Sequence, residues 1–541
     1  ICLNDNMKAI LSEDKMFIDL HYENEGEMLQ TNDYFHRKVK NYHFMKKKFK
    51  GWNGIVAYIY KGKRIRSTMW SKLIEMCEKY HFPLEFENFD GFIREEITYE
   101  FVEKFCKKLL SCHPKIRPYD YQIDTVYKAV RSRFSCVEVA TSGGKTLIMY
   151  MYMMLLRYLK ISKNILIIEP DPGLVIQSYD EWRDYACGKY NLKVAMIHGG
   201  SKDKLSANDF PHAIGNFASL INLPDEFFEK FDTIICDEAH RSVATTIKQI
   251  IAKCGATENL LGCSGSFYKG KGDADEFTVE ENFGPVVRVI KKTDLINRGA
   301  ATNITIRMIN VKFCSRQELL ALSSEKDYIE DGEKSLRYEQ QFIRNHKRLL
   351  EWKCQFICSL KGNTLVYFND KKGGYGRKIY ERLQEISFQR GLSKKVFYID
   401  GDISATEREV IKDYMRNDST GQSILVANYS VFSTGQSIKN LVNVVTGEAI
   451  KSDILLNQSS GRLLRLSDGK EMSYFYDITE DTTVVRSNPM TGQKETKKCF
   501  MQNWSKSRLE YYRSEDLIVE SYNVDITKEG AMEIKESETI F

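Results

Sequence analysis

A strand, a turn of small residues and a helix follow one another between Phe134 and Leu156, and this order constrains the fold more than any other feature. The run "FSCVEVA" is apolar and β-branched, which is typical of a strand buried on both faces. The later run "LIMYMYMMLL" has the length of a buried helix and about half the length that a bilayer span needs. A buried strand that leads directly into a helix predicts a parallel α/β sheet.

The turn between them, "TSGGKT", is close to a phosphate-binding loop, although Val139 stands where the first glycine of the pattern belongs. Backbone N–H groups at a helix N-terminus point at bound phosphate. Lys145 is placed to reach the β- and γ-phosphate oxygens, and the Thr146 hydroxyl is placed to hold Mg²⁺. The residues expected around the phosphates are Thr141, Ser142, Gly143, Gly144, Lys145 and Thr146. The alternative is a chance GKT in a tight turn, so a second motif is needed.

The second motif is "FDTIICDEAHRS" at residues 231–242, where an apolar strand ends in two carboxylates. Doubly wound sheets place their ligand chemistry at the carboxyl ends of strands. We expect Asp237 to share Mg²⁺ with Thr146, and Glu238 to orient or deprotonate an attacking water. A solvated acidic turn is the alternative for this motif alone. The phosphate loop about 90 residues upstream argues against it.

Apolar strands alternate with amphipathic helices in two series, which predicts two tandem α/β lobes with parallel sheets. The strands expected outside the two motifs are 163–170, 192–200, 212–217 and 259–266 in the first series, and 363–369, 395–401, 423–429 and 472–478 in the second. The predicted domains are an N-terminal domain at 1–110, a first lobe at 111–298, and a second lobe with a C-terminal helical extension at 299–541. A chain of 541 residues is long enough for each of them to bury a core.

Composition favours a soluble protein of the cytoplasm. The net charge of +5 is small, and the thirteen cysteines include no CxxC pair and no cluster at zinc-ligand spacing, so we expect reduced thiols. The first residues lack the basic and apolar regions of a secretory signal. These features predict a cytoplasmic location and no membrane partner.

Positive charge is concentrated in residues 37–66, which hold eleven lysines or arginines and no acidic residue. Six aromatic residues are interleaved with them, and the flanking segments are acidic. A solvated basic face is the usual meaning of such a run, but segregated charge is also the footprint of a protein that binds phosphate backbones. The residues expected to contact nucleic acid are Lys46, Lys47, Lys48, Lys50, Trp52, Lys63 and Arg64. Alternation over 54–65 predicts a hairpin, and a helix is expected from Thr68 to about Tyr80.

The second series has no phosphate loop, but it contains "QSSGRLLRL". Gln458, Arg462 and Arg465 stand at positions i, i+4 and i+7, which predicts that they share one face of a helix. A solvated basic face is again the ordinary interpretation. A second lobe without its own phosphate loop favours arginines that complete the site of the first lobe.

In this order, the motifs are similar to those of the superfamily 2 helicase motor, which is built from two RecA-like lobes. The segments that carry the resemblance are "RPYDYQ", "ATSGGKT", "IIEPDPGLVIQ", "GNFASL", "DEAH", "CSGS", "LVYFN", "ANYSVFSTGQS" and "QSSGRLLR", which run from Arg117 to Arg465. In that family the first glycine of the loop is commonly replaced. The resemblance implies an ATP hydrolase that uses ATP and Mg²⁺.

The resemblance also implies roles for individual residues. Arg117, Tyr119 and Gln122 would recognise adenine, and Gly435 would contribute to the nucleotide site. His240 would couple the site to Gln458, while Arg462 and Arg465 resemble arginine fingers, each typically worth roughly 10³–10⁵ in rate. The segment Ser264, Gly265 and Ser266 would link the nucleotide to the nucleic-acid path. The residues implied along that path are Pro170, Gln177, Phe368, Ser433 and Thr434.

The N-terminal segment "YHFMKKKFKGWNG", which precedes the expected hairpin and helix, is similar to the UvsW helicases of bacteriophages. "SVFSTGQSIKN", the chain length and the Ser-Gly-Ser coupling segment match that subfamily as well. The resemblance implies a monomeric helicase that unwinds branched DNA and RNA–DNA hybrids, including forks, four-way junctions and R-loops, during phage recombination, replication and repair. Recombination proteins or single-strand-binding proteins are the protein partners that it implies.

Two other classes of function are alternatives for these motifs. A nucleic-acid-stimulated ATPase that translocates on duplex without separating strands shares every motif, and no strand-separating element is identifiable in the sequence. A metabolic P-loop enzyme, a kinase or a binding scaffold would lack the arginine motif of the second lobe and the basic N-terminal stretch. At the C-terminus, residues 497–526 have helical spacing and are expected to pack on the second lobe, with Trp504, Lys506 and Arg508 as the alternative DNA face.

Overall fold

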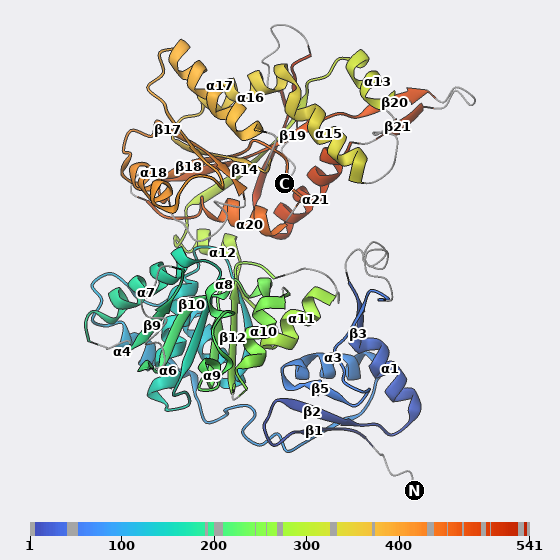
Figure 1. Ribbon diagram of the computed structural model, residues 1–541, viewed down its shortest axis with the longest axis vertical. Coiled ribbons are helices and arrows are strands. Elements are labelled where there is room, and N and C mark those ends of the chain that lie inside the picture. Colours follow the sequence, from blue (N-terminus) through green and yellow to red (C-terminus); the bar gives the residue numbers. More distant parts are fainter. Residues whose placement is uncertain are drawn as a thin grey trace. The chain divides into compact units, whose positions relative to one another are not determined.

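A computed structural model gives the fold of the protein (Figure 1). It describes residues 6–39, 52–189, 193–199, 209–243, 245–255, 257–267, 274–324, 333–370, 374–429, 438–451, 453–467, 470–487, 494–497, 499–527 and 535–537. The chain forms two compact units, Ile1–Ile290 and Lys291–Phe541. The three domain boundaries expected from the sequence stay a prediction. No helix in these ranges is long and apolar enough to span a membrane.

The N-terminal region is a small mixed α/β domain. Its sheet has the strand order β5-β2-β1-β6, in which β1 pairs antiparallel with β2 and parallel with β6. The elements are β1 (Met7–Leu11), β2 (Phe17–His21), α1 (Glu25–Phe35), β3 (His36–Lys38), β4 (Ile55–Ala57), β5 (Arg64–Arg66), η1 (Ser67–Met69), α3 (Trp70–Tyr80) and β6 (Leu84–Glu87). The helix expected from Thr68 to Tyr80 is therefore confirmed as α3 with a short turn before it.

The hairpin expected over residues 54–65 is wrong. β4 pairs with β3, and β5 pairs with β2, so the two strands belong to different sheets. Only an isolated bridge between Tyr60 and Arg64 closes the turn between them. The alternating pattern correctly indicated extended chain, but alternation cannot specify which strand is the neighbour.

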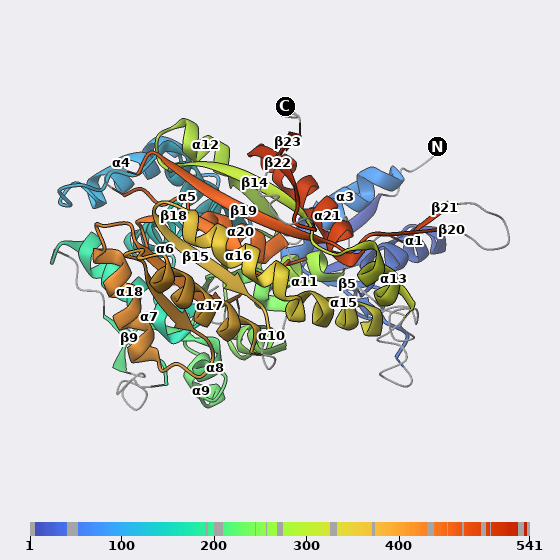
Figure 2. The ribbon, with the colours of Figure 1, turned by 90° about the horizontal axis from the view of Figure 1, so that it is seen from above.

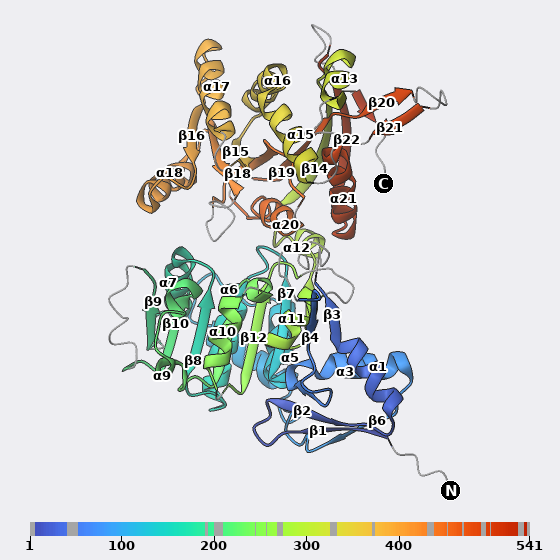
Figure 3. The same ribbon diagram turned by 45° about the vertical axis from the view of Figure 1, so that its right-hand side comes forward.

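The first lobe is built on a seven-stranded parallel sheet in the described residues, with the order β13-β7-β12-β11-β8-β10-β9 (Figure 3). Its strands are β7 (Phe134–Val139), β8 (Ile165–Glu169), β9 (Val194–Ile197), β10 (His212–Asn216), β11 (Thr233–Cys236), β12 (Asn259–Ser264) and β13 (Val286–Ile290). Its helices are α4 (Tyr99–Leu109), α5 (Asp120–Ser132), α6 (Lys145–Tyr158), α7 (Pro172–Ala186), α8 (Phe217–Leu220), α9 (Asp225–Phe228), η3 (Ala239–Val243), α10 (Thr245–Lys253) and α11 (Ala274–Phe283). The predicted strands of this series are confirmed, and β13 was not predicted.

The predicted buried helix is also confirmed, because every residue from Leu147 to Leu156 in α6 is buried. The central strands β7, β8, β11 and β12 are buried along their whole length, as expected for parallel strands covered on both faces. Their carboxyl ends meet at one edge of the sheet. This edge holds both motifs of the first lobe.

The N-terminal domain packs against α11 of the first lobe. The hydroxyl of Tyr58 donates to the carbonyl of Ala274 at 2.5 Å, and the Thr68 hydroxyl donates to the carbonyl of Glu281 at 2.7 Å. The ammonium of Lys72 donates to Glu276 at 2.8 Å. The N-terminal domain is thus attached to the helix that follows the "CSGS" segment in the chain.

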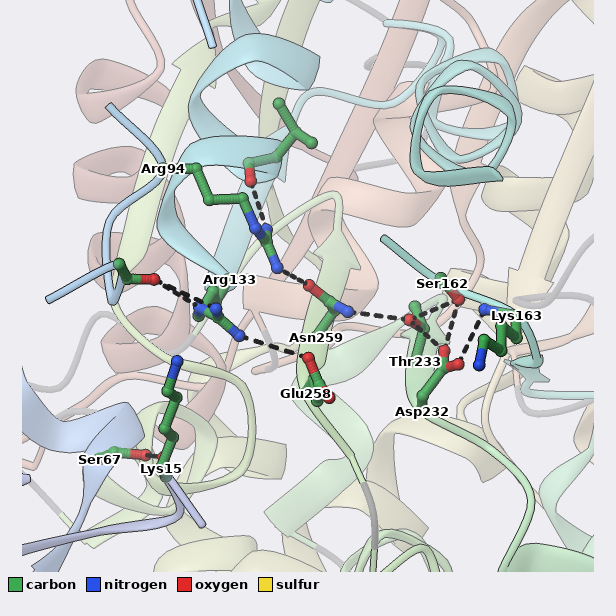
Figure 4. Close-up of polar contacts among 12 residues, drawn as sticks. Lys15, Ser67, Arg94, Arg133, Ser162, Lys163, Asp232, Thr233, Glu258 and Asn259 are labelled. Carbon is green, nitrogen blue, oxygen red and sulfur yellow. Dashed lines mark hydrogen bonds and ion pairs between the residues drawn. The ribbon is translucent and has the colours of Figure 1, made fainter. Parts of the chain in front are cut away.

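A buried polar network anchors the segment that joins the N-terminal domain to the first lobe (Figure 4). Arg94 is buried and donates to Oδ1 of Asn259 at 2.5 Å. Asn259 donates to the Thr233 hydroxyl at 3.1 Å, which donates to Ser162 at 2.9 Å. Ser162 in turn donates to Asp232 at 2.5 Å. The network ties the joining segment to the amino ends of β11 and β12, at the edge opposite the motifs.

The second unit contains an eight-stranded sheet in the described residues, with the order β16-β17-β15-β18-β19-β14-β22-β23. Its elements are α12 (Lys292–Asn297), β14 (Asn303–Lys312), α13 (Arg316–Ser324), α15 (Glu333–Asn345), α16 (Lys347–Ser359), β15 (Asn363–Phe368), α17 (Tyr375–Gln389), β16 (Lys395–Ile399), α18 (Ala405–Asn417), β17 (Ser423–Asn428), β18 (Leu441–Thr446), α20 (Asp453–Gly461), β19 (Met472–Asp481), β20 (Val484–Ser487), β21 (Lys494–Lys497), α21 (Phe500–Ser514), β22 (Ile518–Asp525) and β23 (Lys535–Ser537). All strand pairs from β16 to β22 are parallel, and α16 and α17 pack against each other (Figure 2). The chain therefore has the predicted fold class of two tandem RecA-like lobes after a small α/β domain.

The C-terminal segment is only half helical. α21 packs on the second lobe as expected, but residues 518–525 form β22, which pairs with β14. Arg508 is fully buried and donates to Asp477 at 2.8 Å, so it cannot belong to a DNA-binding face. The packing interpretation of this helix is confirmed.

Candidate nucleotide-hydrolysis site

The phosphate loop joins the buried β7 to the N-terminus of α6, as its sequence predicted. Ser142 and Gly144 have φ angles of 70° and 79°, which lie in the left-handed region. A Cβ on Gly143 would lie 2.7 Å from Cγ1 of Val139 and 2.9 Å from the Ala140 carbonyl. The turn therefore needs glycine at this position. Val139, which replaces the first glycine of the pattern, is fully buried beneath it.

Gln122 and Tyr121 of α5 hold the loop from behind. Nε2 of Gln122 and the hydroxyl of Tyr121 both donate to the carbonyl of Gly143, at 3.0 and 2.9 Å. Oε1 of Gln122 accepts from the backbone N–H of Tyr119 at 2.9 Å. The sequence analysis did not predict a role for Tyr121 at the loop. Its position beside Gln122 was the only signal in the sequence. These contacts connect the segment expected at adenine to the loop expected at phosphate.

Arg117 and Tyr119 lie beside this connection. Arg117 donates to the carbonyl of His113 at 2.7 Å, and the ring of Tyr119 is 43% exposed and stacks on Tyr121 with centroids 5.7 Å apart. An exposed ring next to the phosphate loop can stack on a base. Recognition of adenine by Arg117, Tyr119 and Gln122 stays a prediction.

Lys145 joins the two motifs. Its Nζ donates to Oε1 of Glu238 at 2.9 Å and lies 3.6 Å from Oδ1 of Asp237. Asp237 follows β11 and is fixed by its backbone N–H, which donates to the carbonyl of Ile168 at 2.9 Å. Glu238 has a φ of 49°, an uncommon backbone conformation for a residue with a side chain. The structure thus brings the predicted phosphate-binding lysine and both carboxylates together.

The charges of these three residues depend on one another. Burial acts to raise the pKa of Glu238, but Lys145 and His240 outweigh it and hold this pKa below its usual range. Burial and the neighbouring Glu238 raise the pKa of Asp237, although Lys145 opposes this shift. Burial disfavours the charged form of Lys145, but both carboxylates raise its pKa above the usual value. The surroundings therefore favour the ionised form of Glu238 and disfavour that of Asp237.

His240 and Ser264 extend the site toward the coupling segment. Nδ1 of His240 lies 3.2 Å from Oε2 of Glu238 and 2.8 Å from the hydroxyl of Ser264. Ser264 also donates to the carbonyl of Ser266 at 2.7 Å. A continuous polar chain thus leads from Glu238 through His240 to the end of β12. Coupling of His240 to Gln458 stays a prediction.

Glu169 is a residue that the sequence analysis missed. It ends β8, is fully buried, and accepts a hydrogen bond from Ser178 at 2.7 Å. Burial and the charge of Asp237 raise its pKa well above the usual value. The signal in the sequence was a glutamate at the end of an apolar strand, the same position that Asp237 has after β11. Burial and the nearby Asp237 therefore disfavour the ionised form of Glu169.

One of the two carboxylates has an oxygen atom that fits a bound Mg²⁺. Within the described part of the chain, Oδ1 of Asp237 is buried and accepts no hydrogen bond. A buried carboxylate oxygen without a donor is costly unless a cation approaches it. Hard carboxylate and hydroxyl oxygens are ligands that Mg²⁺ prefers. Asp237, together with Thr146 at the start of α6, fits the ion that the sequence predicted.

The arginine motif of the second lobe differs from its prediction. α20 ends at Gly461, and the N–H of Arg462 donates to the carbonyl of Ser459 at 3.3 Å in a tighter turn. Gln458 therefore lies on the helix, while Arg462 and Arg465 follow it, and the expectation of one shared helix face is wrong. The glycine at position 461 lowers the propensity to continue the helix. Arg462 is buried and Arg465 is half-buried.

The residues expected on the nucleic-acid path differ in their burial and contacts. Gln177 is half-buried and donates to Glu181 at 2.8 Å, and Pro170 is buried. Phe368 is 2% exposed and stacks on Tyr398 in the core of the second lobe, and its contact with nucleic acid stays a prediction. Ser433, Thr434 and Gly435 lie outside the described residues.

In the N-terminal domain, Lys46, Lys47, Lys48 and Lys50 lie outside the described residues. Lys63 is exposed, and the indole of Trp52 donates to the carbonyl of Ile55 at 3.2 Å. Arg64 makes a bidentate pair with Asp19 of β2, at 2.5 and 2.7 Å. The basic stretch has no acidic residue of its own, but a neighbouring strand neutralises part of its charge.

Comparisons with known proteins agree with this geometry. Residues 115–267 match the family described as "Type III restriction enzyme, res subunit", and residues 350–467 match the "Helicase conserved C-terminal domain". The "ATP-dependent DNA helicase uvsW" of Enterobacteria phage T4 is 24% identical over 499 residues, which cover 91% of this chain and 94% of that protein. The "Probable helicase D10" of Escherichia phage T5 is 21% identical over 262 residues, which cover 48% of this chain and 52% of that protein.

Among solved structures, a fragment of a putative HsdR subunit of a type I restriction enzyme from Vibrio vulnificus YJ016 has a similar fold. The TM-score is 0.51 at 16% identity, over 90% of this chain and 80% of that one. Two RecA-like lobes with a phosphate loop, a DEAH motif and a matched C-terminal helicase region define an ATP-hydrolysing helicase of superfamily 2. Within that superfamily, the chain is a UvsW-like helicase.

Proposed function

We propose that this helicase uses ATP and Mg²⁺ to act on branched DNA and on RNA–DNA hybrids, as in migration of forks and four-way junctions and in R-loop unwinding. The observation that carries the proposal is the polar chain from Lys145 through Glu238 and His240 to Ser264. It connects the phosphate loop to the segment that faces the nucleic-acid path in such motors. Similarity to a DNA helicase along nearly the whole chain supports DNA as the substrate.

In the proposed mechanism, Lys145 binds the β- and γ-phosphates, and Thr146 and Asp237 hold Mg²⁺, which neutralises charge on the phosphates when bound. Glu238 orients the attacking water. When the ammonium of Lys145 turns to phosphate, Glu238 loses its strongest cationic neighbour. Its pKa then rises, and a carboxylate with a higher pKa accepts a proton from water more readily.

The second lobe supplies the remaining groups in this proposal. Arg462 and Arg465 act as arginine fingers on the transition state, Gln458 senses the nucleotide through His240, and Gly435 contributes to the nucleotide site. Closure of the lobes on ATP and opening after hydrolysis drive movement. Gly265 and Ser266 transmit the nucleotide state to the nucleic-acid path.

Contacts with DNA are proposed on both units. The basic N-terminal stretch supplies cations that contact phosphates and one aromatic ring that stacks on a base. The cations are Lys46, Lys47, Lys48, Lys50, Lys63 and Arg64, and the ring is that of Trp52. Pro170, Gln177, Ser433 and Thr434 line the path of a single strand. The enzyme works as a monomer in the host cytoplasm during phage recombination, replication and repair, together with recombination or single-strand-binding proteins.

A duplex translocase that does not separate strands is the second candidate. The match of residues 115–267 to a restriction-enzyme subunit favours it, because such enzymes share this half of the motor. The two candidates differ in strand separation and not in hydrolysis.

The test is a panel of single-stranded, duplex, forked, four-way and RNA–DNA substrates, each assayed for ATP hydrolysis and strand separation. The matched control is the Lys145→Ala variant on the same substrates. The proposal expects separation on forked, four-way and hybrid substrates only with active enzyme. Hydrolysis without separation on every substrate would favour the duplex translocase.

A further inference from the structure

A pocket of about 550 Å³ opens on the first lobe between α4 and the C-terminal end of α6. Its lining residues are all apolar or cationic: Phe101, Lys104, Phe105, Lys108, Leu109, Met154, Arg157 and Tyr158. No residue of the hydrolysis site is among them. The pocket has the size of a site for one or two bulky side chains.

Three aromatic rings form its apolar part. The ring of Tyr158 lies 5.1 Å from that of Phe105 and 6.3 Å from that of Phe101, measured between centroids. Tyr158 is 64% exposed and Phe101 is 37% exposed. Exposed aromatic clusters beside a pocket are unusual on monomeric proteins and mark binding surfaces.

Three cations rim the aromatic cluster. Lys104 and Lys108 stand one turn apart on α4 and are exposed, and within the described residues neither makes an ion pair. By contrast, Lys107 on the same helix pairs with Glu103 at 2.8 Å. Arg157 comes from α6 and is half-buried. The positive charge of the rim is therefore available to an external anion.

The pocket lies far from the proposed DNA path. α6 begins at Lys145 in the phosphate loop and ends at Tyr158, and its fourteen residues span about 20 Å. The C-terminal end of α6 lies at the amino edge of the sheet, whereas Pro170 and the two motifs lie at the carboxyl edge. A strand that follows the carboxyl edge does not reach the pocket, which favours a protein ligand over a nucleic acid.

We propose that this pocket binds an acidic peptide segment of a partner protein, with an aromatic or leucine side chain inserted among the three rings. Carboxylates on either side of the anchor would pair with Lys104, Lys108 and Arg157. The apolar anchor supplies burial, and the charges supply attraction and orientation. This inference does not rest on the proposed DNA specificity.

The probe is the fluorescein-labelled peptide Asp-Glu-Asp-Asp-Leu-Phe, titrated with the full-length protein by fluorescence anisotropy. The informative variants are Lys104→Glu with Lys108→Glu, and Tyr158→Ala, which changes an exposed ring. The matched control is Lys107→Glu, because it makes the charge change of one of these two lysine substitutions on the same helix outside the pocket. ATP hydrolysis by each variant verifies that the motor is folded.

The proposal expects saturable binding, weakened at least tenfold by the double lysine variant and by Tyr158→Ala, and weakened less than threefold by Lys107→Glu. Equal loss in all three variants would overturn it, because the binding would then be non-specific attraction. Absence of binding at millimolar protein would also overturn it. So would displacement of the peptide by a thymidine oligonucleotide whose own binding needs Tyr158, because the pocket would then be a nucleic-acid site.

Discussion

The ammonium of Lys145 lies 2.9 Å from Oε1 of Glu238 and donates a hydrogen bond to it. The residue expected at the phosphates is therefore paired with the residue expected at the attacking water. Oδ1 of Asp237 lies 3.6 Å from the same ammonium. Binding of phosphate by Lys145 must therefore change the charge environment of both carboxylates. In the proposed mechanism, this contact connects the binding of ATP to the basicity of Glu238.

Removal of either partner is expected to abolish hydrolysis. Lys145→Ala removes the phosphate ligand, and Glu238→Gln removes the carboxylate that orients water, while neither residue lies on the proposed DNA path. Steady-state ATP hydrolysis should fall by at least 10³-fold, and DNA affinity should stay within about threefold, because the two changes act on transition-state contacts. Turnover retained in either variant would refute the assigned role.

Arg465→Ala is expected to lower kcat more than it raises KM. An arginine finger stabilises charge that develops in the transition state, and the typical loss is roughly 10³-fold or more in kcat. Lys470, whose ammonium donates to the carbonyl of Arg465 at 3.0 Å, should be retained to keep the turn intact. Full ATP saturation kinetics provide the measurement. A change in KM alone would show that Arg465 binds the nucleotide without acting as a finger.

The interface between the N-terminal domain and α11 should weaken as pH rises. Burial raises the pKa of Glu280 to about 7, opposed by Lys72 and supported by Glu276 and Glu75. Because the folded-state pKa lies above the unfolded value, Glu280 contributes stability that is complete below about pH 4.5 and is lost as pH rises through 7. The loss is at most about 3 kcal/mol.

The Glu280→Gln variant isolates this effect, because glutamine cannot ionise. Thermal unfolding at pH 5 should be similar for the variant and the wild type, and at pH 8 the variant should be the more stable of the two. Parallel changes in both proteins between pH 5 and pH 8 would exclude Glu280 as the cause.

The buried pair of the C-terminal helix makes a stability prediction. Arg508 donates to Asp477 at 2.8 Å, and both side chains are fully buried. Arg508→Met leaves the carboxylate with the Tyr512 hydroxyl as a donor at 2.9 Å but with no cation, which should cost about 3 kcal/mol. The control is Arg513→Met on the exposed side of α21, expected within about 0.5 kcal/mol of wild type. The free energies of unfolding of the wild type and the two variants, measured in urea, test this prediction.

The basic N-terminal stretch makes a salt-dependence prediction. If about six of its lysines and arginines contact phosphates, log affinity for forked DNA should fall with log salt at a slope of about −5. Neutralising Lys46, Lys47, Lys48 and Lys50 together should weaken binding and bring that slope to about −2. A slope that stays the same in the variant would place these residues off the DNA.

The parts of the fold that local pattern determines were predictable. β7, β8, β11 and β12 are continuous apolar runs, and α6 is a long buried helix, so each was evident from the sequence. β14, β18 and β22 were not predicted. β14 and β22 pair with each other from opposite ends of the second unit, and pairing at such a distance leaves no local signal.

The site was predictable where the chemistry is carried by short motifs. Lys145, Asp237 and Glu238 meet as expected because parallel strands end at one edge of a sheet. Tyr121 and Glu169 were missed because tertiary contacts define their surroundings: Tyr121 donates to the carbonyl of Gly143, and Glu169 accepts from Ser178 beside Asp237. The sequence analysis placed Arg462 and Arg465 on a helix, but this helix ends at Gly461. The spacing of the arginines alone does not show where the helix ends.

The central claim is that hydrolysis at Lys145 and Glu238 drives the separation of branched DNA. The most direct measurement follows ATP hydrolysis and strand separation together on one forked DNA, with wild type and Glu238→Gln in parallel. The account predicts both activities in the wild type and neither in the variant, with fork binding retained. Strand separation by Glu238→Gln at the wild-type rate would contradict it, because separation would then not depend on the hydrolysis site.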